Sequence, residues 1–233
     1  MKIGIIGPSD TEIMPFIECM DEKEVYKQAM LTFYEGKYED IDIVALYCGV
    51  CKVNAAIAAQ ILIDKFEVTQ VIVVGVAGAI SNKLKIGDTV ISTEVAYHDV
   101  RDGILIEYHP FMDTIYFKAD KELLNICEKA ISKSNVLGSV YFGKIVTGEE
   151  FISDKGRERI IAQYEPLCVD METAAITHVC HVNGIPFIAI RSITDTEEEF
   201  GVDVFEENVD DASARAIAIL KYLLKEISIC NEI

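Results

Sequence analysis

Short, uninterrupted apolar runs alternate with helical patterns along this 233-residue chain, and this alternation constrains the fold more than any other feature. The apolar runs lie at residues 2–7, 42–49, 70–80, 88–93, 139–148 and 185–195. Apolar residues recur at helical spacing over 52–66, 120–132 and 211–227. Strands that are apolar on both faces need helices on both faces. The sequence therefore predicts one α/β domain over residues 1–233, with a central mixed β-sheet flanked on both sides by helices.

Two polar stretches, 100–118 and 195–211, are long enough to be functional loops instead of simple connections. The last helix is predicted to begin at Asp210 or Asp211. Ligands of open α/β sheets gather at the carboxyl ends of the strands. The candidate site elements are the turns that follow the strands near 2–6, 42–48, 70–75, 140–146 and 186–191.

Charge and hydropathy exclude several classes of partner. The chain has 21 Lys and Arg against 39 Asp and Glu, a formal net charge of −18. Nucleic-acid binding needs clustered cations, so this balance argues against it. The first apolar run ends at Pro8 and is too short for the core of a signal peptide. No stretch of about 18 apolar residues occurs, so we expect no membrane span and a cytoplasmic protein.

The cysteines and histidines leave a metal or redox site open as an alternative. Cys48 and Cys51 form a C-x-x-C pair among seven cysteines, but no second such pair follows. Reduced thiols in the core are the favoured interpretation. His178 and His181 could form half of a metal site, although packing or capping is favoured. No dinucleotide or P-loop motif occurs, and no metal or cofactor is predicted.

Five polar residues lie close to predicted strand ends, and each has an ordinary explanation. Glu12 could be an acid in the first turn of a helix, where the helix dipole favours it. Asp170 or Glu172 could cap a helix. Arg191 could belong to an ion pair, and Asp195 could cap a turn. Taken together, they form a possible site.

The order and coverage of several segments point to a known family. The segments are MKIGIIG with Glu12, CGVCKVNAAIAA (48–59), VVGVAGAI (73–80), KIGDTVIS (85–92), YHDV (97–100), GKIVTGEEFI (143–152), VDMETAAITHVCH (169–181) and IPFIAIRSITD (185–195). Together they resemble the 5′-methylthioadenosine/S-adenosylhomocysteine nucleosidases of the nucleoside phosphorylase superfamily. The resemblance implies a nucleoside phosphorylase-like fold, a nucleoside substrate, hydrolytic release of adenine, a homodimer and no cofactor.

The resemblance also implies a role for each candidate residue. Asp195 is expected to protonate N7 of the adenine, Glu12 to position the water, and Arg191 to orient that water or a carboxylate. Glu172 is expected to bind the ribose hydroxyls, Met171 to pack on the sugar, and Asp170 to support the site. The remaining expected binding residues are Phe151 and Ile152 for the purine, Val50 and Phe205 for the 5′-substituent, and Val76, Ala77 and Gly78.

The chemistry of an N-glycosidic bond explains why two carboxyl groups are needed. An adenine anion leaves poorly, so an acid must protonate the base, and its pKa must be raised by burial or by nearby carboxylates. An ionised carboxylate must hold water on the opposite face of the sugar. Negative charge around the ring stabilises an oxocarbenium-like state.

The chain departs from the family pattern at several positions. The family's TGSAGG is VGVAGA here (74–79), so Val76 replaces a serine and has no hydroxyl. Ser9 replaces a methionine, Thr194 replaces a serine, and the family's SGD and GIGK are TGE and GVCK. The loop at 100–112 differs from the aspartate-rich stretch that helps to form the dimer and the 5′ pocket.

Two alternatives stay open at this point. A nucleoside phosphorylase would need a phosphate cradle, which the acidic turn GPSDTE (7–12) disfavours. A catalytically silent nucleoside-binding protein would bind the ligand without turnover, and Val76 is the residue that motivates this alternative.

Overall fold

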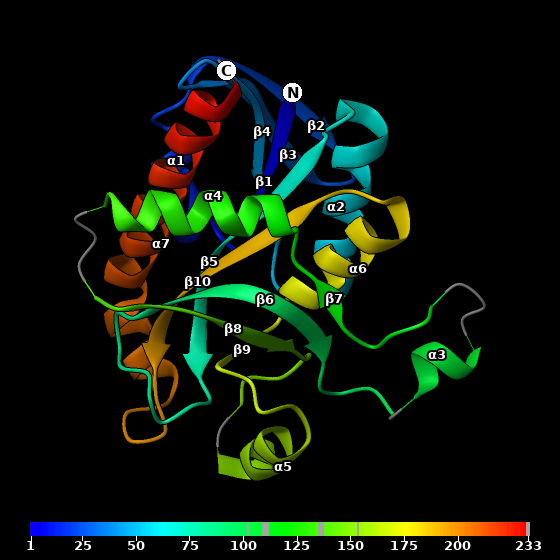
Figure 1. Ribbon diagram of the computed structural model, residues 1–233, viewed down its shortest axis with the longest axis vertical. Helices are drawn as coiled ribbons and strands as arrows, with labels where there is room; N and C mark the ends of the chain where they lie inside the picture. Colours follow the sequence, from blue (N-terminus) through cyan, green and yellow to red (C-terminus); the bar gives the residue numbers. More distant parts are fainter. Residues whose placement is uncertain (102, 109–111, 135–137, 153, 232–233) are drawn as a thin grey trace.

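The computed structural model describes residues 1–101, 103–108, 112–134, 138–152 and 154–231. Its centre is a set of parallel strands that run side by side (Figure 1). Strand β1 pairs with β4 on one side and with β5 on the other, and β5 also pairs with β10. The bounds of these strands are β1 Lys2–Gly7, β4 Ile41–Tyr47, β5 Gln70–Ala79 and β10 Phe187–Asp195.

One end of the sheet closes on itself. Strand β10 pairs with β6, β6 with β8, β8 with β9, and β9 returns to β5. The sheet is therefore mixed, because the β10–β6 and β9–β5 pairings are antiparallel and the others in this ring are parallel. The short strand β7 pairs with β6 outside the ring. The bounds are β6 Thr89–Tyr97, β7 Phe117–Lys118, β8 Val140–Thr147 and β9 Cys168–Asp170.

Helices cover both faces of the central strands, as the apolar strands predict. Figure 1 shows α1 and α7 on one side and α2 and α6 on the other. On the side of α1 and α7, one core cluster contains Phe16, Leu220 and Ile5. On the side of α2 and α6, a second cluster contains Leu62, Ile176 and Val73. The bounds are α1 Asp10–Ile17, α2 Lys52–Phe66, α4 Lys121–Ser132, α6 Thr173–Asn183 and α7 Val202–Asn231.

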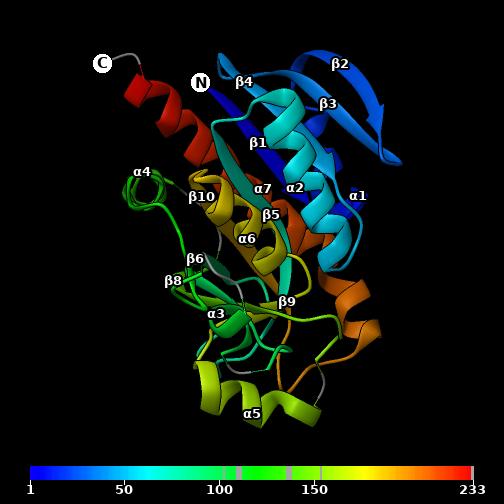
Figure 2. The same cartoon turned by 90° about the vertical axis from the view of Figure 1, so that its right-hand side faces the viewer.

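Two further elements lie near the closed end of the sheet. Helix α5 (Asp154–Tyr164) covers the end of the molecule opposite both termini (Figure 2). Its Ile160 and Tyr164 pack with Val146 and Val169 in a third, smaller core cluster. Helix α3 is short, spanning Ile104–Tyr108.

The last helix begins earlier than the sequence analysis predicts. Helix α7 starts at Val202, so the prediction of a loop over 195–211 with a helix beginning at Asp210 or Asp211 was wrong beyond residue 201. Phe205, Val209 and Ala212 already recur at helical spacing, but the surrounding acids obscure the pattern.

Two other regions contain structure that the sequence analysis did not predict. The stretch 100–118 includes α3 and β7, although residues 102 and 109–111 lie outside the described residues. Residues 21–38 form a hairpin of β2 (Asp21–Gln28) and β3 (Leu31–Tyr38) that extends the sheet beyond β4. Strand β2 is almost fully exposed and rich in charge, which is why no apolar run marks it. Within the described residues, no helix is long and apolar enough to cross a membrane.

Candidate active site

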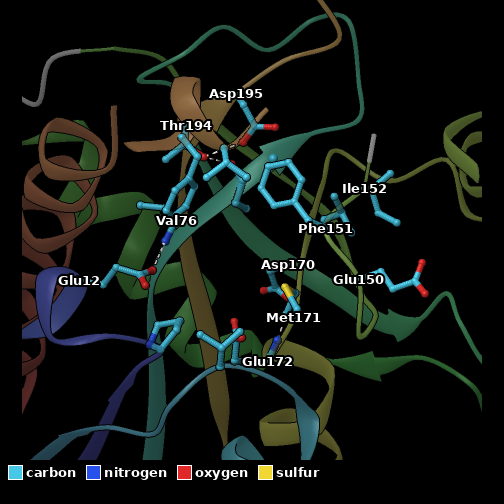
Figure 3. Close-up of a pocket in the computed structure, with 17 residues that line it drawn as sticks. Glu12, Val76, Glu150, Phe151, Ile152, Asp170, Met171, Glu172, Thr194 and Asp195 are labelled. Atoms are coloured by element: carbon cyan, nitrogen blue, oxygen red, sulfur yellow. Dashed lines mark hydrogen bonds between the residues drawn. The ribbon is translucent and has the colours of Figure 1, made fainter. Parts of the chain in front are cut away.

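A cavity of about 290 Å³ opens at the carboxyl ends of the central strands (Figure 3). Its volume is close to the lower end of the range for small-molecule sites, roughly 300–1,000 Å³. Turns or strand ends after β1, β4, β8 and β9 contribute to the wall, as do β5, β10 and α7. The lining residues are Pro8, Glu12, Val50, Val76, Ala77, Gly78, Glu150, Phe151, Ile152, Val169, Asp170, Met171, Glu172, Thr194, Asp195, Val202 and Phe205.

A change of partner along β5 opens the sheet where the cavity lies. Strand β5 pairs with β1 as far as Val73 and meets β9 only at Gly78. Between these points the Val76 N–H donates a hydrogen bond to Oε2 of Glu12, at 2.8 Å. A Cβ atom at Gly75 would lie 2.4 Å from the same oxygen, so only glycine permits this approach.

Glu12 is a buried carboxylate in the first turn of α1, and 4% of its surface is exposed. Its Oε1 accepts a hydrogen bond from the Ser9 hydroxyl at 2.8 Å. Burial raises the pKa of Glu12, while the charge of Arg191 and the bonds from Ser9 and Val76 oppose that rise. The helix position matches the ordinary explanation of Glu12, but its side chain lines the cavity.

Arg191 is fully buried behind the cavity wall and links three carboxylates. Its Nε lies 2.9 Å from Oδ2 of Asp170, one terminal nitrogen lies 3.5 Å from Oε2 of Glu172, and the other lies 3.9 Å from Oε2 of Glu12. Burial alone would lower the pKa of Arg191, but the three carboxylates give a net rise. Unlike the other predicted site residues, Arg191 does not line the cavity.

Asp170 and Glu172 both directly precede α6. The backbone N–H of Cys51 donates to Oε1 of Glu172 at 3.0 Å, and burial raises the pKa of Glu172 to about 7. Asp170 accepts hydrogen bonds from the Thr147 hydroxyl at 2.5 Å and from the Thr173 N–H at 3.1 Å, as well as from the Thr173 hydroxyl. Asp170 therefore anchors the helix, as its capping interpretation predicts, and also faces the cavity.

Asp195 is the last residue of β10, and its carboxyl group is 5% exposed. Oδ1 accepts a hydrogen bond from the Thr194 hydroxyl at 2.8 Å. Burial raises the pKa of Asp195, while the Thr194 bond and the charge of Arg157 partly oppose it. A Cβ atom at Gly78 would lie 3.0 Å from Oδ2, so glycine keeps space beside this carboxyl. The group holds a proton to a higher pH than an ordinary aspartic acid does.

The rest of the cavity is apolar and partly aromatic. The Phe151 and Phe205 rings meet edge to face, with their centroids 6.4 Å apart. Phe151 and Val50 are 44% and 49% exposed, so they stand at the open side. Figure 3 shows Asp195 and Glu172 well separated, with Phe151 and Met171 between them. This arrangement suits a ligand with a flat ring at one end and hydroxyl groups at the other.

The structure brings together nearly all residues that the sequence analysis names. Arg191 is the exception, because it lies behind the wall, where it contacts the carboxylates of Glu12, Asp170 and Glu172 and donates to the Val76 carbonyl. The lining residues that were not predicted for the site are Pro8, Glu150, Val169, Thr194 and Val202. Glu150 directly precedes Phe151, so its place in the sequence could have predicted that it lines the cavity. Val202 was missed because the sequence predicted a later start for α7.

The histidine and cysteine pairs have ordinary surroundings. The His178 ring stacks on Phe117 at 4.8 Å, and the His181 ring lies 5.7 Å from Phe117, so the packing interpretation is confirmed. Cys48 is buried, and its thiol donates to the carbonyl of Gly49. In the described ranges, no group of three or more His, Cys, Asp or Glu residues could hold a metal ion.

Stability is expected to fall as the pH rises through the window set by Glu172. Its carboxyl pKa rises from 4.5 to about 7 on burial, so the folded protein retains a proton that the unfolded chain has released. The contribution of Glu172 to stability is fully present below pH 4.5 and is lost as the pH rises through about 7. Urea denaturation across this window measures it, and Glu172→Gln should flatten the slope. An unchanged slope in that variant would rule out Glu172 as the cause.

The backbone of Cys51 is expected to be strained. Its φ of 82° and ψ of 162° lie in a region that is essentially restricted to glycine. Cys51→Gly should raise the free energy of unfolding by about 1 kcal/mol, because relief of strain outweighs the added chain entropy. Cys51→Ala is the matched control, since it removes the thiol but keeps Cβ. Equal effects of the two variants in urea denaturation would show that the strain is not the cause.

Comparison with known proteins places this fold and cavity in one family. Residues 2–225 match the phosphorylase superfamily. The 5′-methylthioadenosine/S-adenosylhomocysteine nucleosidase of Maridesulfovibrio salexigens is 34% identical, and the alignment covers 97% of this chain and 100% of that protein. The corresponding nucleosidase of an Exiguobacterium strain is 36% identical, with 97% and 99% covered.

Solved structures show the same similarity. The nucleosidase of Colwellia psychrerythraea in complex with adenine superimposes with a TM-score of 0.89 at 30% identity, covering 97% of this chain and 95% of that one. The Neisseria meningitidis nucleosidase in complex with methylthio-immucillin-A gives 0.88 at 30% identity, with 96% and 98% covered. The chain therefore belongs to the phosphorylase superfamily, and within it to the family of 5′-methylthioadenosine/S-adenosylhomocysteine nucleosidases.

Proposed function

We propose that this chain hydrolyses the N-glycosidic bond of 5′-thio-substituted adenosines, methylthioadenosine and S-adenosylhomocysteine, to adenine and the thioribose. The observation that carries the proposal is that Asp195, at the end of β10, and Glu12, in the first turn of α1, line one cavity, each with a distinct set of partners. This is the pair of carboxyl groups that the reaction needs. The named nucleosidase relatives support the choice of substrate.

Asp195 is the general acid in this proposal. Burial raises the pKa of its carboxyl group, so a larger fraction is protonated near neutral pH than for an exposed aspartic acid. Transfer of that proton to N7 lets adenine leave as a neutral molecule while the C–N bond breaks. Phe151 and Ile152, on the same cavity, would hold the purine ring beside the acid.

Glu12 and Glu172 act at the sugar. Glu12 accepts a proton from the attacking water, whose oxygen forms the new bond to the anomeric carbon. Glu172 accepts hydrogen bonds from vicinal ribose hydroxyls, and Met171 packs against the ring. Their negative charge also favours the positive charge that develops on the sugar. Arg191 contacts Glu12, Asp170 and Glu172 from behind the wall, so we assign it a positioning role.

The remaining wall residues hold the substrate in place. Val50 stands at the open side, and Phe205 contacts the exposed Phe151 there, where a 5′-substituent would extend. Val76, Ala77 and Gly78 form the β5 wall between Glu12 and Asp195. Val76 offers its backbone N–H to Glu12, so the lost side-chain hydroxyl does not leave this carboxylate unsupported.

The charge of the cavity favours hydrolysis over phosphorolysis. Among the described residues that line it, the ionisable ones are the carboxylic acids Glu12, Glu150, Asp170, Glu172 and Asp195, with no Lys or Arg. A phosphate ion would enter against this negative charge without a cation at the wall. Water carries no charge and is therefore the favoured nucleophile.

Adenine release in phosphate-free buffer tests the proposed function. Methylthioadenosine, S-adenosylhomocysteine and 5′-deoxyadenosine serve as substrates. Adenine is measured by chromatography together with the free sugar, which is a thioribose from the first two substrates and 5-deoxyribose from the third. We expect hydrolysis that added phosphate does not accelerate. A phosphate-dependent ribose 1-phosphate product would identify a phosphorylase. Ligand binding without turnover of any of the three would identify a silent binding protein.

The proposal also covers the oligomeric state and the metabolic role of the protein. Val53 and Ile57 of α2 and Val182 of α6 are exposed on two helices that pack together, and such apolar groups suit a homodimer contact. Size-exclusion chromatography with light scattering tests this assembly. We also propose a cytoplasmic role in methionine salvage, which follows from the proposed substrates.

A further inference from the structure

Ser9 occupies the N-cap position of α1 but does not cap the helix. Its φ of −127° and ψ of 167° are those of an N-cap residue, yet its side chain makes no capping hydrogen bond. Ser9 and Glu12 have the spacing of a capping box, in which both side chains bond to the backbone of the helix start. Here the Ser9 hydroxyl donates to Oε1 of Glu12 instead, at 2.8 Å.

Glu12 is held from two directions. Ser9 binds Oε1, and the Val76 N–H binds Oε2 at 2.8 Å. Figure 3 shows the Glu12 carboxylate facing the β5 backbone at Val76. A carboxylate has about four lone-pair sites, so these two bonds fix its orientation and still leave a site for water. Ser9 is not among the described residues that line the cavity, so it acts on a ligand only through Glu12.

We propose that Ser9 is a positioning residue for Glu12, whose hydroxyl holds the carboxylate in the orientation that accepts a proton from the attacking water. The inference rests on the proposed hydrolytic function. It gives a role to the residue at which this chain departs from the methionine of the family pattern.

The charges around Glu12 explain why this donor matters. Arg191 faces Glu12 from β10 and favours the ionised form, whereas Asp170 and Glu172 add negative charge from β9 and the start of α6. Burial also disfavours the ionised form. A hydrogen bond from Ser9 favours the charged carboxylate, and it lowers the pKa of Glu12 against the effect of burial.

The test replaces the hydroxyl while preserving the helix start. Ser9→Ala removes it, Ser9→Gly removes it but keeps a residue suited to the N-cap, and Ser9→Thr retains it. Thr11→Ala is the matched control, because it removes a hydroxyl from the exposed part of the same helical turn. Steady-state kinetics, the pH dependence of kcat/KM and thermal melting are measured for each protein.

We expect Ser9→Ala and Ser9→Gly to lower kcat about tenfold, as loss of a hydrogen bond to a charged group implies, with KM changed by less than about twofold. The acid limb of the pH profile should move to higher pH, because Glu12 loses a donor that favours ionisation. Ser9→Thr should retain activity, and Thr11→Ala should match the wild type.

Two results would overturn the inference while leaving the proposed function intact. One is an active wild-type enzyme whose Ser9→Gly variant has the same kcat and the same acid limb in its pH profile. The other is a folded Ser9→Thr variant as impaired as Ser9→Ala, which would show that the hydroxyl is not the relevant group. An inactive wild-type protein would instead contradict the proposed function itself.

Discussion

Replacing Asp195 with asparagine should lower kcat for adenine release by about 10²–10⁴-fold, the usual contribution of a positioned general acid. Asparagine has nearly the same shape, and its amide oxygen still accepts the hydrogen bond that Thr194 donates. It has no proton to give to N7. The fold should survive, because the substitution removes neither a buried ion pair nor a core side chain.

Glu150→Gln is the matched control for Asp195→Asn. Glu150 lines the same cavity but is exposed, and it has no role in the proposed chemistry. This variant should keep kcat within about threefold of the wild type. Stopped assays with chromatographic detection of adenine cover the full range of rates. An Asp195→Asn variant as active as Glu150→Gln would exclude Asp195 as the acid.

Replacing Arg191 with methionine should produce a large loss of stability. The guanidinium is fully buried and contacts Glu12, Asp170 and Glu172, so its removal leaves three buried carboxylates without their cation. Breaking a buried ion pair in this way costs about 3–5 kcal/mol. Urea denaturation at a fixed pH measures the loss.

The loss should also depend on pH. Without Arg191, the pKa values of Glu12 and Glu172 rise further in the folded state, so the variant binds protons on folding. Destabilisation should therefore be larger at about pH 8 than at about pH 5. Arg157→Met is the comparison variant, since Arg157 is also buried but donates to the backbone carbonyls of Ala79 and Ile80. Its charge lowers the pKa of one site carboxyl group, that of Asp195, so its removal should give a weaker pH dependence. A loss with the same pH dependence in both variants would contradict the proposed role of Arg191.

The sequence predicted the central strands well because they are apolar over their whole length. Strand β5, for example, is buried at nearly every position and therefore stands out as a continuous run. The hairpin β2–β3 could not be found in this way, because β2 lies at the edge of the sheet and exposes most of its charged residues. The start of α7 was missed for a related reason, since acids interrupt its apolar stripe.

The ordered motifs predicted which residues form the site, but they did not predict the contacts between those residues. The sequence pattern placed Glu12 just beyond the turn after the first strand and Asp195 at the end of the last strand, and both residues line one cavity. The separation of β5 from β1 beyond Val73 could not be predicted, because strand pairing depends on distant segments. The same holds for Arg191, whose three carboxylate partners come from three separate parts of the chain.

A comparison of methylthioadenosine with its 7-deaza analogue tests the proton transfer from Asp195 most directly. The analogue has a carbon at position 7 and cannot accept the proton there, yet it fills the same space. We expect the wild-type protein to bind both compounds with similar affinity and to cleave only methylthioadenosine. Release of the deazapurine at a rate comparable to that of adenine would contradict the proposed role of Asp195, because cleavage would then proceed without protonation at that position.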